Sequence, residues 1–63
     1  MSESRRLLQV DSDDAVREQT ATVVREATAF EYEGVSTAQA ALSRLSSSTF
    51  DCVVIAARLP ERD

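Results

Sequence analysis

The hydrophobic pattern changes its period repeatedly along the chain, and this alternation is what most restricts the fold. Short apolar runs at residues 7–10 and 52–56 have the length of strands, and residues 30–33 alternate aromatic with charged side chains. Between these segments, apolar residues recur at helical spacing. The order is therefore strand, helix, strand, helix, strand, and crossovers of this kind specify a parallel α/β sheet.

This pattern places each element within narrow limits. We expect strands over residues 6–10, 30–35 and 51–56, and helices over residues 14–28 and 37–46. Each helix is expected to turn one apolar stripe toward the sheet. These stripes comprise Val16, Thr20, Val23, Val24 and Ala27 in the first helix, and Ala38, Ala41, Leu42 and Leu45 in the second.

The last strand differs from the other two because its apolar run is uninterrupted and rich in β-branched residues. Such a run is typical of a strand buried on both faces. The single cysteine of the chain, Cys52, falls within it, and we expect it to be a small buried hydrophobe. The serine-rich stretch at residues 46–49 is expected to be the loop that precedes this strand.

The composition excludes several classes of function. The chain of 63 residues has no His and one Cys, so His-ligated or Cys-rich metal sites and internal disulfides are excluded. All seven basic residues are Arg, which excludes lysine-based chemistry. A net charge of −4 disfavours direct binding to nucleic acid. No apolar run approaches the ~18 residues of a membrane span. We expect a cytoplasmic protein without direct nucleic-acid or membrane contacts.

An acidic turn follows the first strand. Its residues, Asp11, Ser12, Asp13 and Asp14, lie where the carboxyl ends of parallel strands meet, the usual ligand-binding edge of such sheets. Carboxylates gathered at that edge are suitable ligands for Mg²⁺. Asp and Ser are also the preferred caps of a helix N-terminus, and Asp13 and Asp14 stand at the start of the predicted helix. The turn is therefore either a cation site or a helix cap.

These residues also carry a family resemblance. Residues 7–13 (LLQVDSD), followed by a helix, resemble the opening strand and acidic turn of a response-regulator receiver domain. Residues 50–60 (FDCVVIAARLP) resemble its third strand and next loop, and residues 37–42 (TAQAAL) match the spacing of its second helix. The stretches FDCVV and TAT are similar to N-terminal receivers of haloarchaeal sensor and regulator proteins. The resemblance implies the N-terminal half of a flavodoxin-like doubly wound sheet, with strand order 2-1-3, across residues 1–63.

The resemblance also indicates that the family's chemistry is missing. Receivers accept a phosphoryl group on an Asp four residues before a loop proline, and counting back from Pro60 gives Ala56. Asp51 lies about 16 Å away at the other end of the strand and is too distant to substitute. The family's adjacent acidic pair falls on Asp11 and Ser12, and Asp13 would act only after a one-residue shift. We expect no catalytic residue, no cofactor, no enzymatic activity and little affinity for Mg²⁺.

Three functions remain compatible with this sequence. The first is a receiver-like module of phosphorelay signalling that is not phosphorylated and acts through protein–protein contact. The second is a truncated or decayed gene product without independent function, and the third is the N-terminal fragment of a larger sensor kinase or transcription regulator. In each case the third strand would expose an apolar edge. We expect the isolated 63 residues not to fold as a stable monomer. Either the native chain continues and covers that edge, or the edge binds a protein partner or a second copy.

Overall fold

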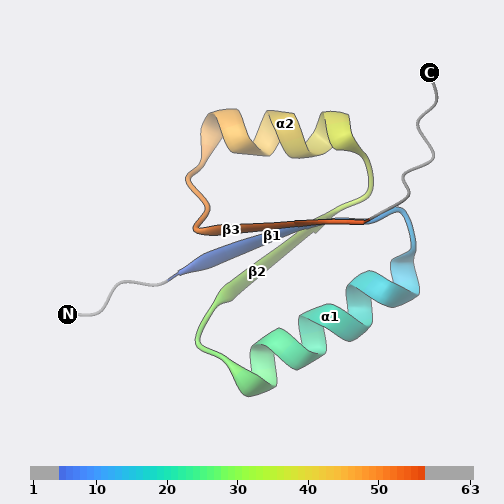
Figure 1. The fold of residues 1–63 in the computed structure, drawn as a ribbon, viewed down its shortest axis with the longest axis vertical. Coiled ribbons are helices and arrows are strands. Elements are labelled where there is room, and N and C mark those ends of the chain that lie inside the picture. The colour runs from blue at the N-terminus through green and yellow to red at the C-terminus, as the bar shows by residue number, and fades with distance from the viewer. Residues whose placement is uncertain (1–4, 57–63) are drawn as a thin grey trace.

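The computed structural model describes residues 5–56 as a three-stranded parallel sheet with one helix on each face (Figure 1). The elements are, in chain order, β1 (Arg6–Val10), α1 (Asp14–Ala27), β2 (Glu31–Val35), α2 (Ala38–Ser47) and β3 (Cys52–Ile55). These bounds differ from the predicted ranges by at most one residue at either end. The prediction of a parallel α/β sheet with strand order 2-1-3 is confirmed.

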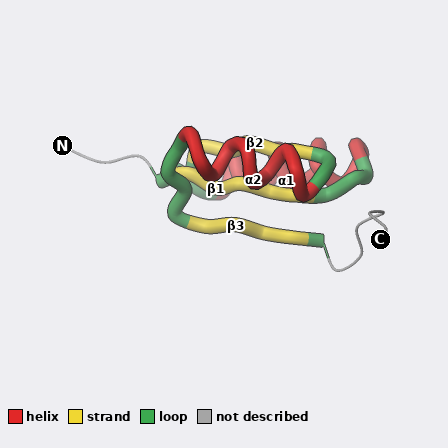
Figure 2. The backbone as a smooth tube through the Cα atoms, turned by 90° about the horizontal axis from the view of Figure 1, so that it is seen from above, coloured by secondary structure: helices red, strands yellow, loops and turns green. Residues whose placement is uncertain are grey.

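The first strand is the centre of the sheet. β1 pairs with β2 from Arg6 opposite Glu31 to Val10 opposite Val35. On its other side it pairs with β3, where Val10 lies opposite Ile55. Seen from above, β3 forms one margin of the sheet and lies clear of both helices (Figure 2). The two crossovers therefore return the chain to both sides of β1 and bring the three carboxyl ends to one edge.

Side-chain caps begin both helices. Asp13 Oδ1 accepts hydrogen bonds from the backbone N–H groups of Ala15 (2.9 Å) and Val16 (3.3 Å), which fixes the start of α1. Thr37 Oγ1 accepts a hydrogen bond from Ala40 N at 3.1 Å and does the same for α2. The second helix continues to Ser47, so the first two serines of the predicted loop are helical.

The core is small and lies beside β1. Leu8 and Val10 are the two largest fully buried side chains, and they pack with Ala41 of α2. Val35 and Phe50 lie against this cluster. On the other face, α1 buries Ala21 and Val24.

The predicted stripe of α1 is only partly correct. Val23 is 62% exposed and Ala27 is also exposed, whereas Ala21, which lies outside the predicted stripe, is buried. The reason is the position of the helix, which packs chiefly on β2. The flank of α1 that carries Val23 therefore has no neighbour to cover it among residues 5–56.

Two predictions about β3 are wrong. All four of its residues are exposed, so the strand is not buried on both faces, and Cys52 is not a buried hydrophobe. The physical cause is again coverage by the helices. α1 packs on β2, α2 packs on β1 and β2, and neither packs closely on β3. An uninterrupted apolar run indicates that a strand needs neighbours over both of its faces. Residues 5–56 do not supply such neighbours for β3.

Candidate functional site

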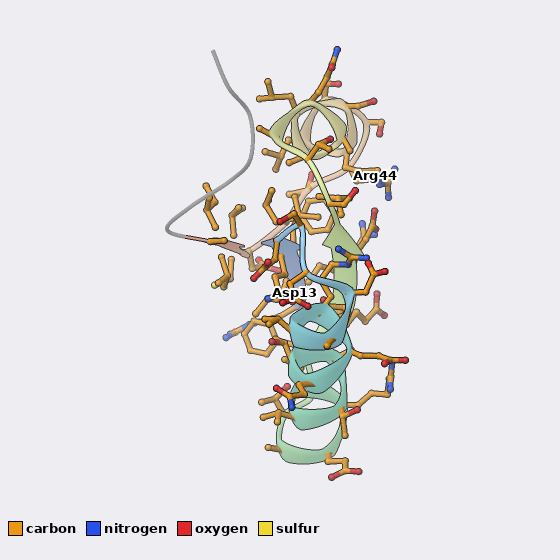
Figure 3. The ribbon with its side chains drawn as sticks, turned by 90° about the vertical axis from the view of Figure 1, so that its right-hand side faces the viewer. Asp13 and Arg44 are labelled. Atoms are coloured by element: carbon orange, nitrogen blue, oxygen red, sulfur yellow. The ribbon has the colours of Figure 1, made fainter. Side chains whose placement is uncertain are left out.

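The candidate site is the sheet edge formed by the carboxyl ends of the strands. Ala56 N donates a hydrogen bond to Val10 O at 2.9 Å, and Asp11 N donates one to Val35 O at 3.0 Å. These two bonds place Ala56 beside the acidic turn, as the sequence indicates for this fold. Asp13 lies at the N-terminal end of α1, next to this edge (Figure 3).

The carboxylates of the acidic turn hold the loop that joins β1 to α1. Asp11 Oδ1 accepts a hydrogen bond from Asp13 N at 2.9 Å, which closes a local turn. Arg17 then returns from the first turns of α1, where its guanidinium donates to Asp11 O at 2.6 Å and also pairs with Asp14. Helix capping, one of the two interpretations of this turn, thus accounts for the side chain of Asp13.

The donors available to a cation at this edge are few. Asp11 is half-buried, Ser12 is exposed, and Ala56 contributes only a methyl group. Across residues 5–56, no three His, Cys, Asp or Glu side chains gather closely enough to hold a metal ion. The candidate metal ligands that do carry a carboxylate at this edge are Asp11 and Asp13. In each of them, one carboxylate oxygen already accepts hydrogen bonds from backbone N–H groups.

Within residues 5–56, the other carboxylate next to β3 in the sequence is Asp51, and it lies at the opposite end of the sheet. Asp51 N donates to Arg6 O at 2.8 Å, and Asp51 Oδ2 accepts from Arg6 N at 2.8 Å. This pair of bonds closes the ladder at the amino ends of β1 and β3. Asp51 is therefore fixed in a structural position, one strand length from Ala56.

A polar network that the sequence analysis did not identify lies beneath α1. Gln9 is the one buried polar residue among those the structure describes, with 5% of its surface exposed. Its Oε1 accepts a hydrogen bond from the Tyr32 hydroxyl at 2.5 Å, and its Nε2 donates to Thr20 Oγ1 at 3.3 Å. Burial of the phenol raises the pKa of Tyr32 above its ordinary value of 10. The network joins three neighbouring elements, β1, β2 and α1.

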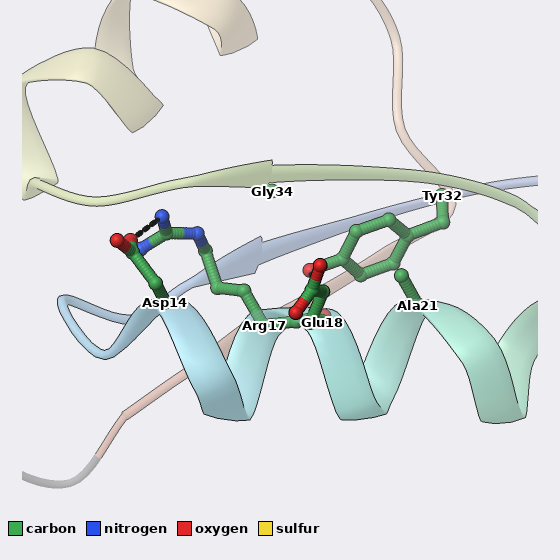
Figure 4. Close-up of a pocket in the computed structure, with 6 residues that line it drawn as sticks. All are labelled: Asp14, Arg17, Glu18, Ala21, Tyr32 and Gly34. Carbon is green, nitrogen blue, oxygen red and sulfur yellow. Dashed lines mark hydrogen bonds and ion pairs between the residues drawn. The ribbon is translucent and has the colours of Figure 1, made fainter.

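Tyr32 also borders a shallow pocket between α1 and β2 (Figure 4). Its wall includes Gly34, and a Cβ added at that glycine would lie 2.5 Å from the Tyr32 hydroxyl oxygen. The missing side chain of Gly34 is thus what lets the phenol reach Gln9. The guanidinium of Arg17 on the rim already donates to the Asp11 carbonyl oxygen and pairs with the exposed carboxylate of Asp14.

The other face of β2 carries ion pairs. Glu33 accepts two hydrogen bonds from the Arg44 guanidinium, one of them 3.0 Å from Nη2, and Arg6 lies 3.9 Å away. Figure 3 labels Arg44, which projects from α2. These hydrogen bonds hold the pKa of Glu33 below its ordinary value of 4.5 and raise the pKa of Arg44. The pair ties α2 to the outer strand of the sheet.

The exposed apolar side chains are concentrated around β3. The large hydrophobic residues exposed among residues 5–56 are Val16, Val23, Leu42, Leu45, Val53, Val54 and Ile55. Three belong to β3 itself. Leu42 and Leu45 of α2 join Val53 and Ile55 in lining an apolar groove of about 190 Å³.

On the α1 face, Val16 and Val23 belong to the same flank as Thr20, which reaches β1 through Gln9. That flank is opposite the pocket over β2, so it points toward β3. The exposed apolar surface therefore borders β3 on both faces of the sheet.

Sequence signals exist for some of the residues that were missed. A lone Gln within the apolar run of β1, and a Thr within the apolar stripe of α1, together indicate a buried hydrogen-bonded pair. The partner, Tyr32, belongs to the alternating stretch at residues 30–33, but no pattern shows which residue its hydroxyl contacts. The Glu33–Arg44 pair joins different elements and has no local signature.

Comparison with known proteins gives no relative for this chain. No family model, no curated protein and no solved structure matches it. Within residues 5–56, neither helix combines the length and the apolar character that crossing a membrane requires.

Proposed function

We propose that this chain is a receiver-like module of phosphorelay signalling that does not take up phosphate and acts through protein–protein contact. The observation that carries the proposal is the position of Ala56, whose backbone N–H is bonded to Val10 at the candidate edge. A receiver-like sheet would need its phosphoacceptor there, and the methyl group of Ala cannot attack phosphorus. β3 itself carries no carboxylate, and Asp51, which precedes the strand, is bound to Arg6 at its far end.

The acidic turn supports the same proposal. A phosphoryl transfer needs a metal ion to neutralise the phosphoryl oxygens. At this edge Ser12 offers a neutral hydroxyl where the receiver pattern has an acid, and Asp13 is occupied as a helix cap. Two of the carboxylates that would hold Mg²⁺ are therefore missing or engaged. The scaffold of the fold is retained while its reactive groups are replaced.

Protein contact is supported by the surface around β3. Exposed apolar patches of this kind mark interaction sites in proteins that are otherwise well covered. The β3 backbone also has an unpaired outer edge among the described residues. Both features suit a partner that adds a strand to the sheet.

The test is phosphoryl uptake from a small donor. The purified chain is incubated with acetyl phosphate and Mg²⁺, and intact mass is measured before and after hydroxylamine treatment, with an active receiver domain as the control for the reagent. We expect no added phosphoryl group. A hydroxylamine-labile phosphate on the wild-type chain would show a functional acceptor and would end this proposal.

The double variant Ser12→Asp, Ala56→Asp tests the assignment of the edge. Transfer to the carboxylate introduced at position 56 would form a bond between its oxygen and phosphorus and release acetate from acetyl phosphate. Uptake in this variant, with none in the wild type, is the expected result if Ala56 occupies the acceptor position. Uptake by the wild type and the variant to the same extent would contradict the assignment.

A further inference from the structure

Among residues 5–56, the outer edge of β3 has a defined set of unpaired main-chain groups. Ala56 N–H is bonded to Val10 O, and main-chain groups alternate in direction along a parallel strand. The groups of Cys52, Val54 and Ala56 therefore point toward β1. Those of Val53 and Ile55 point outward, so each copy offers two N–H donors and two C=O acceptors along this edge.

These four groups are self-complementary in one antiparallel register. A two-fold axis perpendicular to the sheet and passing beside Val54 places Val54 opposite its own symmetry mate. Val53 then lies opposite Ile55 of the second copy, and these two residues exchange both of their hydrogen bonds. All four outward groups of each copy find partners. Centring the pair on Val53 instead would set Ile55 opposite Asp51, whose N–H is already bonded to Arg6.

The side chains favour the same register. On the face that carries α2, Val53 and Ile55 alternate between the two copies, and on the α1 face Val54 meets Val54. No charged residue occurs between Cys52 and Ala56, so a chain of net charge −4 can approach a second copy here without placing like charges opposite each other. The other edge, β2, carries Glu31 and Glu33 and lacks this property.

We propose that two copies of this chain associate through antiparallel pairing of their β3 strands, centred on Val54. The result is a continuous six-stranded sheet with order 2-1-3-3-1-2. The interface is isologous, as a two-fold requires. The two apolar grooves beside α2 merge into one trough that spans the dyad. This proposal rests on the proposed function, which is protein–protein contact, and it specifies that the protein partner is a second copy of the chain.

Disulfide formation tests the register directly. In a Cys52→Ser background, Val54→Cys places two thiols at a non-hydrogen-bonded antiparallel pair, about 4.5 Å apart between Cα atoms, which a disulfide can span. The matched control is Val53→Cys in the same background. That residue and its symmetry mate are two positions out of register, and their Cα atoms are separated by more than the ~7 Å limit.

We expect Val54→Cys to become a covalent dimer under mild oxidation and Val53→Cys to remain monomeric on a non-reducing gel. Equal cross-linking of both variants would indicate random collision of the chains and overturn the proposal. Cross-linking of Val53→Cys alone would overturn the register. No cross-linking of either variant would overturn the pairing.

Sedimentation equilibrium of the wild-type chain provides an independent measurement. We expect a mass that rises with concentration from 6.9 kDa to twice that value. Val54→Lys, which sets two like charges directly opposite each other, should abolish the rise. Thr22→Lys is the matched control, since Thr22 is exposed on α1 but lies outside the apolar surface that borders β3, and this variant should dimerise like the wild type. A wild-type chain that stays monomeric, or a Val54→Lys chain that dimerises unchanged, would overturn the proposal.

These outcomes are separable from those of the proposed function. Phosphoryl uptake by the wild-type chain would remove the proposed function and leave the cross-link at Val54 intact. A chain that neither takes up phosphate nor dimerises would retain the proposed function and lose this partner.

Discussion

The two edge strands of the sheet, β2 and β3, differ in their charge and in their coverage by helices. The β2 edge carries Glu31 and Glu33, and the second of these is bound by Arg44 and approached by Arg6. Helices lie over both faces of this strand. The β3 edge carries four uncharged residues, all exposed, and neither α1 nor α2 covers its faces. Charges on an edge strand prevent pairing with other chains, and only β2 has them.

The two sides of the sheet also differ in how far their polar and apolar groups have partners within residues 5–56. On the β2 side, the described polar groups are satisfied internally: the buried Gln9 has two partners, and no buried side-chain N or O atom among residues 5–56 lacks a hydrogen bond. On the β3 side, the apolar side chains and the backbone edge both lack neighbours within the described part of the chain. The residues of β3 are apolar, as in a protein core, yet their side chains are exposed.

The largest expected effect is the difference in stability lost when one apolar side chain is truncated at the centre of the sheet and another is truncated on β3. Leu8 is fully buried at the centre of the sheet, and Leu8→Ala should cost about 2–5 kcal/mol, enough to unfold a domain of this size. Ile55 is 61% exposed, so Ile55→Ala should cost well under that at low protein concentration. Urea titration followed by circular dichroism measures both.

The concentration dependence of these two variants sharpens the comparison. If β3 pairs with a second copy, the cost of Ile55→Ala grows as the wild-type chain becomes dimeric, whereas Leu8→Ala is unfolded throughout. Equal costs for Leu8→Ala and Ile55→Ala at low concentration would contradict the assignment of β3 as an uncovered edge. A wild-type chain that unfolds cooperatively as a monomer at every concentration would contradict the prediction that these 63 residues need a partner.

The next largest effect concerns the satisfied side. Tyr32→Phe removes the hydroxyl that donates to Gln9 and leaves a buried amide oxygen without a partner, which should cost about 1–3 kcal/mol. Gly34→Ala should act in the same direction because its Cβ would collide with that hydroxyl. Chemical denaturation at neutral pH measures both changes.

The same phenol predicts a dependence on alkaline pH. Burial raises the pKa of Tyr32 in the folded chain. The neutral phenol therefore stabilises the fold at any pH below 10, the ordinary pKa of tyrosine. This contribution is lost as the pH rises through the folded-state pKa. The difference in stability between wild type and Tyr32→Phe should therefore decrease at strongly alkaline pH. A difference that stays constant would contradict the role of the buried hydroxyl.

The sequence predicts the architecture well because period and length are local signals. The strand at Arg6–Val10, the cap at Asp13 and the cap at Thr37 each depend on neighbours within a few residues. The prediction of a buried Cys52 is wrong because burial there depends on a partner for β3 that the described residues do not supply.

Non-local contacts account for what was missed at the candidate site. The position of Ala56 at the edge of the sheet follows from strand length, and the sequence is sufficient for it. The hydrogen bond from Tyr32 to Gln9 joins residues 23 positions apart, and no spacing rule connects them. The same holds for Glu33 and Arg44, whose geometry depends on how α2 lies over the sheet.

The smallest expected effect tests the charged edge itself. Glu33→Gln removes the ion pair with Arg44, and because the Glu33 side chain is 29% exposed, the loss should be at most about 1 kcal/mol. The pKa of Glu33 is lowered in the folded chain, so its contribution is present above the ordinary value of 4.5 and is lost as the pH falls through the folded-state pKa. Thermal unfolding of both proteins across this range should give curves that separate near neutral pH and converge in acid. If the edge charges also prevent pairing at β2, Glu33→Gln should associate more readily than the wild type, and the Val54→Lys substitution, which blocks only β3, should not reverse that increase.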